Sequence, residues 1–127
     1  RTIGGYHNIS HHGKDEAKLK QLAEIEIGQM ELLNEMLQGL NDVEENNGTL
    51  LDNTMVLYGC HMGDANIHNN KNLPVILAGG GFKHGQHLAF NSDNNAPLAN
   101  LYVSMLQNMG LDRSKFASST GTLTGLS

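Results

Sequence analysis

The sequence predicts an α/β protein, and the 127 residues are expected to form a single domain. Two continuous apolar runs, Met55–Gly59 and Leu73–Gly79, are typical of short strands that are covered on both faces. The segments before and after them carry apolar residues at steps of three and four, as amphipathic helices do. Two strands are fewer than the four to six of a usual sheet. We therefore expect the chain to belong to a larger sheet or to form a homo-oligomer.

The amino-terminal third is predicted to be a loop followed by a long helix. Residues 1–13 contain glycines around a His/Asn/Ser cluster, which favours a loop. A helix is predicted from about Lys14 to Asn41, and an Asn-Asn-Gly turn follows at 46–48. The apolar stripe of this helix consists of Leu19, Leu22, Ile25, Leu32, Leu33, Met36, Leu37 and Leu40.

The remaining elements follow from the apolar runs and the glycines. Strands are predicted at about residues 54–59 and 73–78, and Gly79-Gly80-Gly81 ends the second strand because glycine favours turns. The 13-residue connection fits neither a tight hairpin nor a helical crossover, and we favour antiparallel strands. A short strand is expected at His87–Phe90 within an irregular segment. A second helix is predicted from Pro97 to Gly110.

Composition excludes several classes of function. The net charge is −5, basic residues are scattered and aromatic residues are few, so we expect no nucleic-acid partner. No apolar stretch approaches the roughly 20 residues of a membrane span. The single cysteine, Cys60, cannot form an internal disulfide, and we expect it to be a small buried hydrophobic residue rather than a nucleophile paired with His61.

Two short segments concentrate the side chains that bind metals. His7, His11 and His12 precede the long helix, and their spacing would place His7 and His11 on one helical face. Asp64 and His68 follow the first strand, where His61 is a further candidate. Imidazole and carboxylate groups suit zinc, and also Mn²⁺ or Fe²⁺. The alternatives are an exposed polar loop at the amino terminus and Asx turns that satisfy the backbone after the strand.

Other polar features are interpreted structurally. The Gly79–Gly81 turn lacks the Lys-Ser/Thr pair of a phosphate-binding loop. His84 and His87 are expected to be surface residues, and Asp52-Asn53 is expected to serve a turn.

With these motifs in view, the chain resembles the carboxy-terminal portion of an uncharacterised bacterial protein family whose members commonly carry twin-arginine export signals. That family is similar in turn to the alkaline phosphatase and sulfatase superfamily. The resemblance covers nearly the whole chain. It is carried by His7-x-x-Ser10-His11-His12, residues 48–59, Gly63–His68, Leu73–Gly81 and Pro97–Leu101.

The resemblance implies a metal-dependent hydrolase of phosphate or sulfate esters on a mixed α/β sandwich, with zinc as the expected cofactor. His7 and His11 would take the places of the superfamily's Asp-x-x-x-His pair, and His68 that of its final histidine. Asp64 stands near the strand-end pair, where Cys60-His61-Met62-Gly63 replaces Asp-His-Gly. The expected metal ligands are His7, His11, His12, His61, Asp64 and His68.

The superfamily's nucleophile lies far upstream of these motifs, and no residue of this chain matches it. We therefore expect the chain to be the carboxy-terminal part of a larger alkaline-phosphatase-like domain. It would be completed by a missing amino-terminal part and be located in the periplasm or outside the cell. The alternative is a non-catalytic exported binding or structural domain of the same fold.

Overall fold

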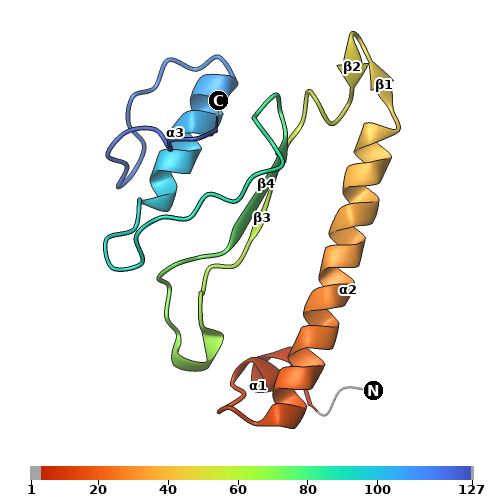
Figure 1. Ribbon diagram of the computed structural model, residues 1–127, viewed down its shortest axis with the longest axis vertical. Coiled ribbons are helices and arrows are strands. Elements are labelled where there is room, and N and C mark those ends of the chain that lie inside the picture. The colour runs from red at the N-terminus through yellow and green to blue at the C-terminus, as the bar shows by residue number, and fades with distance from the viewer. Residues whose placement is uncertain (1–3, 127) are drawn as a thin grey trace.

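The computed structural model describes residues 4–126 and contains both helices and strands, as the sequence predicts (Figure 1). Its elements are α1 (Tyr6–Ser10), α2 (Glu16–Asn41), β1 (Glu44–Glu45), β2 (Gly48–Thr49), β3 (Met55–Gly59), the 3-10 helix η1 (Ala65–Ile67), β4 (Val75–Gly79) and α3 (Leu98–Asn108).

Helix α2 begins at a side-chain cap and runs for 26 residues. The carboxylate of Asp15 accepts a hydrogen bond of 2.9 Å from the backbone N–H of Lys18, which satisfies one of the free donors of the first turn. The predicted long helix is confirmed. The prediction of loop throughout residues 1–13 is wrong, because α1 forms one short turn that packs on α2 and buries Ile9 completely.

Within residues 4–126, the strands form two separate antiparallel pairs. The turn predicted at 46–48 joins β1 to β2, with Glu45 opposite Gly48. Strands β3 and β4 are antiparallel, with Leu57 opposite Leu77 at the centre of the register. The favoured direction of these strands is therefore confirmed.

The carboxy-terminal helix is also confirmed, and the tail that follows it returns along its surface. The amide of Asn100, which is 7% exposed, accepts from the backbone N–H of Thr120 at 2.8 Å. The hydroxyl of Ser104 accepts from the N–H of Leu123 at 2.9 Å. The strand expected at His87–Phe90 is wrong, because this segment is irregular and pairs with no strand among the described residues.

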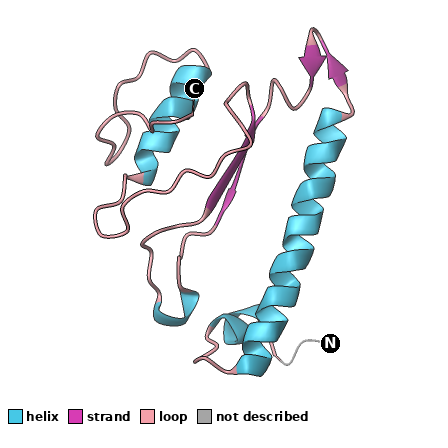
Figure 2. Cartoon of the chain, viewed as in Figure 1, coloured by secondary structure: helices cyan, strands magenta, loops and turns pink. Residues whose placement is uncertain are grey.

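The β3–β4 pair lies between α2 and α3 (Figure 2). Few side chains of this arrangement are buried, and the largest fully buried ones, Ile9 and Val103, lie in α1 and α3. The core therefore consists of small separate clusters. No helix in the described part of the chain combines the length and apolar character needed to cross a membrane.

Candidate functional site

The first part of the candidate site is the α1 turn. The backbone N–H of His11 donates to the carbonyl oxygen of His7 at 3.2 Å, so the helical spacing of the two residues is realised. Their ring centroids lie 4.7 Å apart with an angle of 74° between the planes. The hydroxyl of Ser10 also donates to the carbonyl of His7 at 2.8 Å. These bonds hold both imidazoles on one side of the turn.

The second part is the loop that contains η1. Asp64 begins the 3-10 turn, and His68 ends it in the left-handed region at φ 54°. An isolated bridge between Asp64 and Asn69 closes the loop. The His68 ring lies 4.8 Å from the His11 ring at an angle of 77°. Three imidazoles from two segments distant in sequence therefore form one continuous row.

A hydrogen bond joins the same two segments. The amide oxygen of Asn66 in η1 accepts from the backbone N–H of Gly13 at 2.8 Å. Lys18 of α2 donates through Nζ to the carbonyl oxygen of His11 at 3.3 Å. Sequence reasoning did not identify Asn66 or Lys18, because both act through backbone groups that become neighbours only in the folded chain. No local pattern marks either residue.

The other predicted ligands lie outside the row of rings. His12 is half-buried, and its Nδ1 accepts from the N–H of Lys14 at 3.0 Å. His61 is exposed between β3 and η1. The Oδ1 atom of Asp64 accepts from the N–H of Asn66 at 2.9 Å, which is the Asx-turn interaction that was the alternative to ligation.

The three rings meet edge to face in this conformation. Among residues 4–126, no group of three or more His, Cys, Asp or Glu side chains is arranged to hold a metal ion. The chemistry of the donors still suits zinc, because imidazole nitrogen is one of its preferred ligands. His7 and His68 are exposed, and His11 is half-buried. Ligation would therefore require rotation of these side chains about their χ angles.

A second polar group includes Tyr6, the first residue of α1. Partial burial raises the pKa of the Tyr6 phenol above its ordinary value, and the negative charges of Cys60, Glu26 and Tyr58 raise this pKa further. Cys60 is exposed, so the expectation of a small buried residue there is wrong. The chain has left the sheet at Gly59, and nothing described covers the residue that follows.

The remaining polar motifs have structural roles. Both the N–H and the hydroxyl of Thr49 donate to Oδ2 of Asp52, at 2.7 and 3.0 Å, so Asp52 closes a turn as expected. His84 bonds through Nε2 to the carbonyl oxygen of Gly79 at 3.0 Å. This contact holds the glycine turn against the end of β4.

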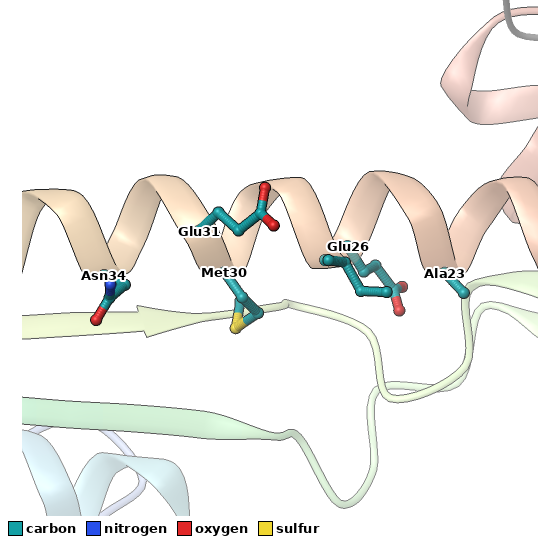
Figure 3. A pocket seen from close by; sticks show the side chains of 6 residues that line it. Ala23, Glu26, Met30, Glu31 and Asn34 are labelled. Atoms are coloured by element: carbon teal, nitrogen blue, oxygen red, sulfur yellow. The ribbon is translucent and has the colours of Figure 1, made fainter.

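One hollow of the described chain lies on α2, and no histidine lines it. It is a shallow groove of about 490 Å³ along α2, and it holds no imidazole (Figure 3). Its lining consists of Ala23, Glu26, Ile27, Met30, Glu31 and Asn34. The histidine row is therefore a surface site.

Comparison with protein-family models, with curated proteins and with solved structures finds no match to this chain.

Proposed function

We propose that this chain carries the metal-ligand part of a hydrolase that acts on phosphate or sulfate esters, within an alkaline-phosphatase-like fold. The observation that carries the proposal is the row of His7, His11 and His68, whose neighbouring rings lie 4.7 and 4.8 Å apart. Imidazoles from two distant segments rarely cluster at a protein surface unless they bind a common ligand or pack against each other.

Under this proposal, His7, His11 and His68 hold a divalent cation, with zinc as the expected ion, and Asp64, His12 and His61 are close enough in sequence to assist. The bound cation would polarise an ester oxygen and stabilise the charge that develops on it. The chain's own contribution is to fix the donors. Asn66 ties the η1 loop to Gly13, and Lys18 holds the carbonyl of His11. These contacts correspond to the outer-shell supports that orient ligands in metal sites.

The proposal also states where the protein is located and which part of the polypeptide supplies the nucleophile. The family resemblance supports export to the periplasm or the exterior, and an upstream nucleophile supplied by further polypeptide. The substrate would be a small ester. Cell fractionation of the native host, probed with an antibody to this chain, tests the location.

The alternative function is a non-catalytic exported binding or structural domain. One observation favours it: the Asp64 carboxylate serves the Asn66 N–H, as a loop residue with no ligand would. In this case the three rings stabilise the junction of α1 and η1 by edge-to-face contact alone.

Metal titration separates these functions. We expect isothermal titration with ZnCl₂ to give about one zinc per chain, and His11→Ala and His68→Ala to weaken binding by about tenfold or more. His87→Ala is the matched control, because His87 is an exposed histidine outside the row. Equal affinity in all four proteins would refute the site.

Hydrolysis of p-nitrophenyl phosphate and p-nitrophenyl sulfate is measured next, on the zinc-loaded chain together with the upstream polypeptide that would supply the nucleophile. Turnover that His11→Ala abolishes supports the hydrolase directly. Tight zinc binding with no turnover, even after the upstream polypeptide is added, would favour the binding or structural domain.

A further inference from the structure

Apolar side chains of α2 and β4 are left uncovered on one side of the β3–β4 pair. Ile27 and Met30 of α2 are 60% and 37% exposed, and Ile76 of β4 is 42% exposed. Ile27 and Met30 also line the groove along α2 (Figure 3). Uncovered apolar groups of this size mark an interaction surface when they lie together.

The strand register shows that Ile76 lies on the α2 side. Ile76 is directly opposite Tyr58, and residues opposite each other in an antiparallel pair project from the same face. The Tyr58 hydroxyl donates to Oε1 of Gln29 in α2 at 3.1 Å, which fixes that face as the one that α2 covers. Tyr58 therefore points toward α2, and Ile76 on the same face of β4 is left open.

Helical geometry places the groove on the flank of α2. Successive residues turn by about 100°, so Met30 lies about 100° and Ala23 about 120° around the helix from Gln29. Figure 3 shows Ala23 and Met30 on the side of α2 nearer the strands. The groove is lined by α2 residues alone, and the exposed Ile76 of β4 lies on the face of the β3–β4 pair that is turned toward α2.

The outer edge of β4 is also open. Among the described residues, the sheet that contains β4 has two strands, and Val75–Ala78 make no backbone hydrogen bond outside that pair. The strand sequence Val75–Gly79 carries no charge. An uncharged edge with unpaired N–H and C=O groups is a template for another strand.

We propose that β4 pairs antiparallel with β4 of a second copy of this chain, giving a continuous four-stranded sheet. The two-fold axis would be perpendicular to the sheet, so both copies of α2 would lie on the same face. The two β3 strands would be about 14 Å apart, from three strand spacings of about 4.8 Å. Packed helices are normally 8–10 Å apart. The two Ile76 side chains and the two α2 flanks would occupy the extra space.

The exposed area is consistent with this partner. The chain exposes 9079 Å², whereas a compact protein of 13.8 kDa exposes about 6,600 Å². The excess is about 2,400 Å² per chain. Obligate homodimers bury roughly 2,000–5,000 Å² in total, or about 1,000–2,500 Å² per copy. A second copy seated on β4 and the α2 flank would cover part of this excess.

The charges of the groove predict how the affinity of this dimer depends on salt concentration. Glu26 and Glu31 line the flank that would approach the same flank of the partner copy. Like charges repel, so the dimer is expected to strengthen as salt screens them. A basic polypeptide docking on the same groove would instead bind more weakly as salt rises.

Light scattering coupled to size exclusion tests the proposal, with loading concentrations from about 1 to about 200 µM at low and high salt. We expect a dimer whose dissociation constant falls with salt. Ile76→Lys should raise this constant by about 100-fold, because it places a charge on the uncharged strand that would pair with its copy. Ile67→Lys is the control, since Ile67 is 64% exposed on η1, away from β4.

A second pair of variants guards against misfolding of the first, and circular dichroism checks the fold of each. Ile27→Asp should weaken the dimer, whereas Leu32→Asp should not. Leu32 has a similar exposure of 65% but lies about 140° away around α2. A monomer at every concentration, open-ended aggregation, or equal effects of the Ile27 and Leu32 substitutions would overturn the proposal.

Discussion

Replacing Ile9 by alanine tests whether α1 is anchored as the candidate site requires. Ile9 is fully buried in a turn of five residues that packs on α2, and the same turn carries His7 and ends at His11. The turn has no side-chain cap at its amino end. Burial of Ile9 therefore anchors the turn on α2, together with the hydrogen bonds that Lys18 donates to Asn8 and His11.

The cost of Ile9→Ala follows from the atoms removed. Three carbon atoms leave the interior, and at about 0.8 kcal/mol each the lost burial is about 2.4 kcal/mol. The residual cavity adds to this, and buried Ile→Ala substitutions span about 2–5 kcal/mol. Because a single short turn can collapse into the space, we expect about 2–3 kcal/mol.

Urea unfolding followed by far-ultraviolet circular dichroism measures this change, at one fixed protein concentration because association also stabilises. With a slope of about 1.5 kcal/mol/M, the midpoint should fall by about 1.3–2 M. Ile67→Ala is the control, and its exposure of 64% predicts a change within about 0.5 kcal/mol. If both variants unfold at the wild-type midpoint, α1 is not anchored by Ile9, and the histidine row loses its structural basis.

Three further perturbations probe the charged and glycine positions. The pKa of Tyr6 is raised in the folded chain, so the folded chain keeps a proton that the unfolded chain releases above pH 10.0. The free energy of unfolding should therefore fall as pH rises past that value. Tyr6→Phe should remove this fall when stability is measured by urea titration. Hydrogen bonds from Thr49 lower the pKa of Asp52 below 3.8 in the folded chain. The stability that they contribute is complete above pH 3.8 and is lost as pH falls through the lowered pKa. Asp52→Asn should abolish this dependence of stability on acid pH. Gly79→Ala should lower the thermal midpoint more than Gly81→Ala: both have positive φ, at 73° and 74°, but a Cβ at Gly79 alone would overlap two backbone carbonyls.

The helices and strands that sequence predicts well are those with a repeated signal. Helix α2 carries eight stripe positions, and β3 and β4 are unbroken apolar runs, so each is specified by many residues at once. The α1 turn was missed because one turn has no periodicity to detect, and its stability comes from tertiary contact. The exposure of Cys60 was missed for a related reason: sequence does not show where a neighbouring layer ends.

The sequence predicts which types of residue form the candidate site, but not which of the candidate histidines come together in it. Ligand chemistry identified two segments, and the structure places His7, His11 and His68 in one row. It does not place His12 or His61 there, although they are adjacent in type and sequence. The difference depends on the direction of each side chain at a turn. That direction is set by backbone contacts such as the Asn66 to Gly13 bond, which no local pattern encodes.

The two proposals can fail independently because they occupy different parts of the fold. The histidine row lies where α1 meets η1, whereas the proposed interface follows β4 and the flank of α2 (Figure 1). His11→Ala should therefore reduce zinc affinity and leave the dimer dissociation constant within about twofold, and Ile76→Lys should do the reverse. If each substitution changed both measurements, the row and the sheet edge would be one coupled unit. Zinc would then bind across the assembled dimer, and the ligand set would have to include residues of the partner copy.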